Sequence, residues 1–125
     1  MLETMSRIVC NLLEARTIAH KHHLNSLSYA QHMALREFYE GIGEIADTLA
    51  EESQGYLGEL LDLGEIVTAF EYTAEEDPSS FLHGLETSLR AYRENIPEEA
   101  THILNTLDAA FSLISSTQYK LRFLQ

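Results

Sequence analysis

The chain has 125 residues, of which 45% are hydrophobic and 22% charged, and its formal net charge is −12. This length suits one domain over residues 1–125, and so acidic a surface argues against nucleic acid and anionic membranes as partners while it favours metal cations. A single cysteine, Cys10, excludes an internal disulfide framework, and the lack of a membrane-length apolar run or a secretory start predicts a soluble, cytoplasmic protein.

Four segments show the apolar spacing of amphipathic helices, and no alternating stretch predicts a strand. The first segment spans about Leu2–His23. Ser28 then stands three residues before Gln31, which is the spacing of a capping box. It predicts a second helix over about Tyr29–Tyr56.

Prolines mark the starts of the third and fourth helices. Asp77 followed by Pro78 predicts an N-cap and a first helical position, with the third helix ending at about Asn95. The stretch Pro97-Glu98-Glu99 predicts the start of the fourth helix, because acidic residues suit the positive end of a helix. This helix should continue towards Leu124.

The connection Leu57–Asp77 is too long for a plain turn between packed helices. It is apolar at helical intervals, which predicts a short helix across the bundle; the apolar residues are Leu60, Leu63, Val67 and Phe70. Short first and third connections make antiparallel pairs, whereas a long middle connection lets the second and third helices run parallel. The sequence therefore predicts an all-α, ferritin-like four-helix bundle with one crossover, although a kinked four- or five-helix bundle fits the same pattern.

The predicted second helix carries a polar stripe opposite its apolar face. At about 100° per residue the stripe is made of His32, Arg36, Glu40, Gly43, Asp47 and Glu51. Any solvated helix face collects charge, so the stripe can be surface alone. It can also bind metal, because Asp47 and Glu51 are four residues apart and can converge on one cation.

A metal site on this stripe needs a second chain. His32 lies about 22 Å from Asp47 along the helix axis. A second copy, packed antiparallel about a two-fold axis near residues 40–42, would place His32 beside the neighbour's carboxylates. Gly41 and Gly43 stand near that crossing point and favour a close symmetric contact, the alternative being that they merely loosen the helix.

Together with His20, the possible ligands on the stripe have a spacing similar to that of a known family. The spacing of His20, His32, Asp47 and Glu51 resembles, without a gap, that of the ferroxidase ligands in the Dps-like (DNA protection during starvation) branch of the ferritin superfamily. The resemblance implies that the two imidazoles come from one subunit and the two carboxylates from its two-fold mate. It further implies iron as the metal, oxidation of Fe(II) by peroxide or oxygen, and a homo-oligomer that stores iron in a twelve-subunit cage.

The sequence departs from that family at several positions. An acid usual four residues after the second histidine is Arg36 here, and the tryptophan beside the first histidine is Lys21. Glu37 and Glu40 are nearby substitutes for the missing acid. No basic DNA-binding tail is found, and the predicted third helix is short, which leaves complete cage assembly open.

Arg36 defines the alternative hypothesis. It can pair with Asp47 or Glu51 of a neighbour and turn the metal site into a salt-bridged interface. The protein would then be a ferritin-fold oligomer with a degenerate site, acting as a structural or interaction module without redox activity.

The remaining histidines and the cysteine have plainer interpretations. His22 and His23 are expected to cap the first helix, where cations suit the negative end of the dipole, and metal binding is the less favoured alternative. His83 and His102 are expected at the surface or an interface, and Cys10 in the core.

Overall fold

The computed structural model describes residues 1–64, 66–68 and 70–125. It contains four α-helices, and the described residues form no strand. The helices are α1 (Leu2–Leu24), α2 (Tyr29–Leu57), α3 (Pro78–Arg93) and α4 (Thr101–Phe123). The all-α prediction and the four helical segments are confirmed, and none of the described helices is long and apolar enough to cross a membrane.

Two helix starts follow the predicted capping chemistry. The Ser28 hydroxyl accepts a hydrogen bond from the backbone N–H of Gln31 at 3.2 Å. The carboxylate of Asp77 accepts one from the backbone N–H of Ser79 at 3.3 Å, with Pro78 as the first helical residue. Each cap satisfies an N–H that has no partner inside its helix.

The fourth helix begins later than the sequence predicts. The backbone N–H of Ala100 donates to the carbonyl of Pro97 at 3.0 Å and closes a turn, so α4 starts at Thr101. Ile96 and Ala100 are buried on either side of this turn. The turn allows both side chains to be buried, and this burial outweighs the helix start that the sequence predicts near Pro97.

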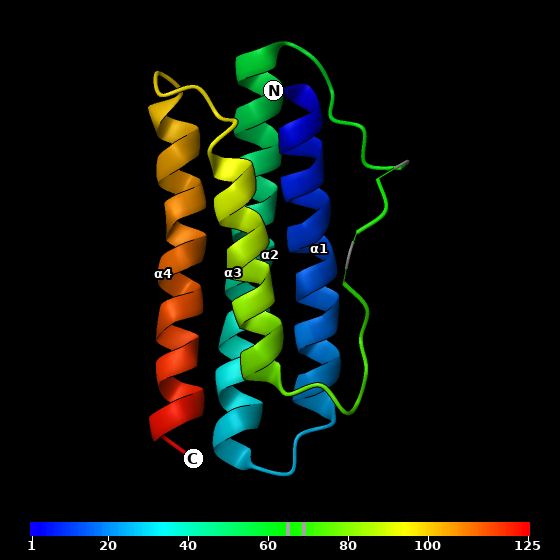
Figure 1. Ribbon diagram of the computed structural model, residues 1–125, viewed down its shortest axis with the longest axis vertical. Helices are drawn as coiled ribbons and strands as arrows, with labels where there is room; N and C mark the ends of the chain where they lie inside the picture. The colour runs from blue at the N-terminus through cyan, green and yellow to red at the C-terminus, as the bar shows by residue number, and fades with distance from the viewer. Residues whose placement is uncertain (65, 69) are drawn as a thin grey trace.

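The four helices pack so that neighbours are antiparallel and diagonals parallel. α1 packs on α2 and α3, and α4 packs on the same two helices. Figure 1 shows α2 and α3 rising in the same direction, while α1 and α4 descend. The long middle connection allows this arrangement, because it returns the chain along the length of the bundle before α3 begins.

The connection between α2 and α3 does not contain the predicted short helix in its described residues. The connection must run the length of α1, which has 23 residues and spans about 35 Å, and each helical turn within the connection would shorten its reach. An extended chain covers the distance easily. The side chains of Leu60 and Val67, on which the prediction rested, are 81% and 87% exposed.

Polar groups of the helices hold the connection in place. The backbone N–H of Leu61 donates to the Gln54 side-chain oxygen at 3.0 Å. The backbone N–H of Asp62 donates to the Ser6 hydroxyl at 3.1 Å. The buried thiol of Cys10 points at the carbonyl of Leu63, and burial raises the pKa of this thiol. Side chains thus satisfy backbone groups that a helix would have paired internally.

One apolar core joins the four helices. Its largest fully buried side chains are Met5, Ile8, Leu12, Ile18, Leu35, Phe38, Ile42, Leu49, Leu82, Leu85, Leu89 and Ile103. Most of these residues recur at the three- and four-residue spacing that predicts the helices, so this spacing also marks the inward side of each helix.

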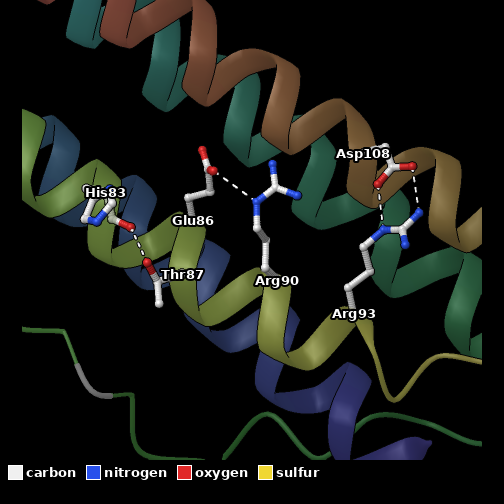
Figure 2. Close-up of polar contacts among 6 residues, drawn as sticks. All are labelled: His83, Glu86, Thr87, Arg90, Arg93 and Asp108. Atoms are coloured by element: carbon white, nitrogen blue, oxygen red, sulfur yellow. Dashed lines mark hydrogen bonds and ion pairs between the residues drawn. The ribbon is translucent and has the colours of Figure 1, made fainter.

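An exposed polar seam runs along α3 and α4 (Figure 2). The Arg93 guanidinium donates two hydrogen bonds to the carboxylate of Asp108, at 2.8 and 2.9 Å. Arg90 pairs with Glu86 on its own helix. His83 is exposed, and its backbone carbonyl accepts a hydrogen bond from the Thr87 hydroxyl. The exposed position of His83 agrees with the sequence interpretation.

Candidate metal site on α1 and α2

Three histidines gather where α1 ends and α2 begins. The rings of His23 and His32 stack with centroids 3.6 Å apart and an interplanar angle of 18°. His20 lies beside them, its ring 5.9 Å from that of His23. The structure therefore brings the two predicted imidazole ligands, His20 and His32, into contact with a common neighbour, His23, which was expected to cap the first helix.

Tyr39 completes this ring cluster from α2. Its ring stacks on the exposed ring of His20 with centroids 4.2 Å apart and meets His23 edge-on at 5.3 Å. The contact gives an otherwise solvent-facing His20 a preferred orientation, because aromatic pairs have defined geometries. Tyr39 was missed in the sequence because an aromatic residue beside an apolar face is expected simply to join the core.

His23 and His32 also hydrogen-bond to each other's backbone. Nδ1 of His23 lies 2.5 Å from the carbonyl oxygen of His32, and Nδ1 of His32 lies 2.9 Å from the carbonyl oxygen of His23. A carbonyl oxygen can only accept, so each Nδ1 must carry a hydrogen and donate it. In a neutral ring this leaves the lone pair on Nε2, which is the nitrogen available to a metal.

The capping role predicted for His22 and His23 is wrong. Both imidazoles are buried, with 4% and 6% of each residue exposed. His23 bonds to α2, while His22 packs its ring against Tyr72 of the connection at 4.9 Å and near Phe81 of α3. The end of α1 is covered by other elements, so its last side chains serve tertiary packing rather than the helix dipole.

The two predicted carboxylate ligands lie towards the other end of α2. Asp47 and Glu51 are exposed, and neither forms an ion pair within the described residues. No three histidine, cysteine, aspartate or glutamate side chains among the described residues are placed to hold a metal within one chain. One chain thus holds its imidazoles where α1 meets α2 and the two carboxylates towards the other end of α2, without bringing them together.

Arg36 pairs inside its own helix. Its Nε lies 3.1 Å from a carboxylate oxygen of Glu40, and both side chains are more than half exposed. This hydrogen bond and charge raise the pKa of Arg36, so it stays a cation. Glu37, the other nearby acid, pairs with Lys120 of α4. Both acids considered as substitutes for the missing ligand are therefore engaged in ion pairs.

Gly41 and Gly43 of α2 have close neighbours within the chain. A Cβ on Gly41 would lie 2.9 Å from a methyl carbon of Leu113 on α4, and one on Gly43 would lie 3.1 Å from Cδ of Arg16 on α1. Both glycines thus leave room for side chains of neighbouring helices of the same chain. The symmetric contact inferred from these glycines loses its support.

Comparison with known proteins yields one family. A profile described as a family of unknown function (DUF5856) matches residues 23–121 of the chain. No curated protein and no solved structure matches it. The matched region includes His23, His32, Asp47 and Glu51, whereas His20 lies just before it.

Proposed function

This chain belongs to the DUF5856 family, and we propose that it is a Dps-like iron-binding protein of ferritin-like fold. In this proposal Fe(II) is the substrate, and a two-fold dimer supplies the site. His20 and His32 come from one copy, and Asp47 and Glu51 come from its mate. A cytoplasmic setting suits such a protein, because Fe(II) persists in reducing surroundings.

The observation that carries the proposal is the hydrogen bond that fixes the ring of His32. Metal-binding histidines almost always donate their second ring N–H to a carbonyl or carboxylate, which fixes the ring and leaves the other nitrogen for the metal. Nδ1 of His32 makes such a bond to the carbonyl of His23 at 2.9 Å. The parallel course of α2 and α3 also supports the one-crossover bundle that the fold requires (Figure 1).

The donor set suits iron in both oxidation states. Fe(II) accepts imidazole and carboxylate ligands together, and carboxylates hold the ferric product. Asp47 and Glu51 are exposed and four residues apart on α2, so they can approach one cation from the same side. If peroxide is the oxidant, two Fe(II) ions each give one electron to one H₂O₂, which takes up two protons and forms two waters.

Iron titration tests the binding part. The wild-type protein should take up Fe(II) saturably under anaerobic conditions and develop ferric absorbance when peroxide is added. His32→Ala and Asp47→Ala should each abolish both signals. His102→Ala and Glu98→Ala are matched controls, because both side chains are exposed and far along the chain from the stripe. If the wild-type protein takes up no more Fe(II) than buffer alone does, the proposal is eliminated.

Subunit mixing tests the shared site directly. A dimer of one His32→Ala chain and one Asp47→Ala chain contains two sites. One site has both His32 and Asp47 intact, and the other site has lost both. Mixed dimers should therefore regain about half of the wild-type iron capacity, which neither variant shows alone. Light scattering on the wild-type protein gives the assembly, and a strictly monomeric protein would contradict a shared site.

A second candidate function is favoured by Arg36 itself, which stands where the resembled family usually has an acid. At this position the fixed cation repels Fe(II), and the protein would be an oligomeric interaction module without redox activity. Arg36→Asp separates the two candidates. It should raise iron affinity if the site binds iron, whereas it should weaken the dimer and leave iron unbound if Arg36 serves only the interface.

A further inference from the structure

His23 lies at the centre of the ring cluster but is not one of the proposed ligands. Its ring contacts those of three neighbours, His32 at 3.6 Å, Tyr39 at 5.3 Å and His20 at 5.9 Å between centroids. It is only 6% exposed, whereas His20 is open to solvent. One buried imidazole therefore touches both predicted nitrogen ligands.

The bonds between His23 and His32 form a closed pair. Each ring donates from Nδ1 to the backbone carbonyl of the other residue, at 2.5 and 2.9 Å. The ring of His32 is thus held at its edge by the carbonyl of His23 and on its face by the imidazole of His23. Rotation of His32 would break a hydrogen bond and separate two stacked rings.

We propose that His23 is a positioning residue of the iron site. It does not touch the metal; it holds the plane of His32 so that Nε2 is presented as the ligand atom. This inference rests on the proposed iron-binding function. Partners of this kind change metal affinity by about 10- to 100-fold when they are removed.

Three substitutions of His23 separate its two contacts with His32. His23→Ala removes both the stacked ring and the hydrogen bond to the carbonyl of His32. His23→Asn retains an N–H donor for that carbonyl, and His23→Phe retains the ring without the donor. His102→Ala is the matched control, because that histidine is exposed on α4. Far-UV circular dichroism and thermal unfolding show which variants fold.

Two measurements are made on each folded variant. The first is the ring ¹⁵N spectrum of His32 in iron-free protein, which reports the position of its ring hydrogen. The second is the anaerobic Fe(II) affinity. In the wild-type protein His32 should carry its hydrogen on Nδ1 alone. The backbone carbonyl of residue 23 remains in every variant, so the ring hydrogen of His32 should stay on Nδ1 in each of them. Loss of the stacked ring in His23→Ala should weaken Fe(II) binding about 10-fold, and His23→Phe, which keeps a ring against His32, should recover more affinity than His23→Asn.

The outcomes distinguish this inference from the proposed function. If all three variants bind Fe(II) as tightly as the wild-type protein does, the role of His23 is overturned. The proposed iron site itself is unaffected by that result. A mixed ring spectrum for His32 in the wild-type protein would overturn the role of His23 as well. No Fe(II) binding by the wild-type protein, with the ring hydrogen on Nδ1 as expected, would instead refute the proposed function. If His23→Ala fails to fold, the comparison of the Asn and Phe variants decides.

Discussion

The α1–α2 pair and the α3–α4 pair are joined by different kinds of polar contact. At the end of α1, buried and half-buried rings bond to backbone carbonyls, as His23 and His32 do. Along α3 and α4, the pair of Arg93 with Asp108 is exposed to solvent (Figure 2). Because water screens the second kind of contact and not the first, we expect the ring cluster to contribute more to stability.

The largest effect is expected at His23. His23→Ala should lower the free energy of unfolding by about 2 kcal/mol, because a buried hydrogen bond and a ring stack are lost together. Urea unfolding at neutral pH measures the loss. His20→Ala is the matched control in the same cluster, and its exposed ring should matter much less. If His23→Ala loses less free energy of unfolding than Arg93→Ala does, the exposed ion pair contributes more to stability than the ring cluster.

Acid should weaken the end of α1 through His22. Burial lowers the pKa of His22 below its ordinary value of 6.5, although Glu76 and Asp77 oppose the shift. The unfolded chain therefore binds a proton more readily, so the stabilising contribution is complete above pH 6.5 and is lost as the pH falls from there towards the folded pKa. Unfolding across this range should show the decline in the wild-type protein.

The control for that pH dependence is His22→Gln. This variant has no ionisable group at the position, so its free energy of unfolding should decline less steeply over the same pH range. Parallel pH profiles for the two proteins would show that His22 does not cause the decline.

The exposed seam should give a smaller and salt-sensitive effect. Arg93→Ala should cost about 0.5 kcal/mol of unfolding free energy at low ionic strength. The difference from the wild-type protein should nearly vanish in about 1 M salt, because exposed charges are screened. A loss that persists at high salt would show that Arg93 acts by packing instead.

The smallest effects are expected at Gly41 and Gly43 of α2. Gly43→Ala should raise the free energy of unfolding by about 0.5 kcal/mol, since alanine favours a helix and the exposed Arg16 side chain can move aside. Gly41→Ala should bring no gain, because its Cβ would press on Leu113 and overpacking offsets the helix propensity. Thermal unfolding of the two variants side by side tests the difference.

Local patterns predicted the helices and part of the candidate site. Hydrophobic spacing and the caps at Ser28 and Asp77 located three helix starts closely, because these signals act within a few residues. The helical period also placed Asp47 and Glu51 on the exposed face of α2. Sharing of the site between two copies stays a prediction.

Long-range contacts account for the errors. The connection was expected to contain a short helix, but its course is set by the distance it must span and by groups such as Ser6 and Gln54. His23 was assigned to the end of its own helix, whereas its partner is nine residues further on α2. A helical period shows which side a residue faces and does not show which side chain lies opposite.

The sequence by itself determined the acidic character of this protein, its four helices and the stripe of possible ligands on α2. These properties depend on composition and on neighbours three or four residues apart. Only the tertiary structure decided that the described residues of the connection form no helix, that Gly41 and Gly43 face helices of the same chain, and that His23 and His32 are bonded to each other. Such contacts depend on how whole helices pack, because burial and hydrogen bonding between distant residues are settled only when the core forms.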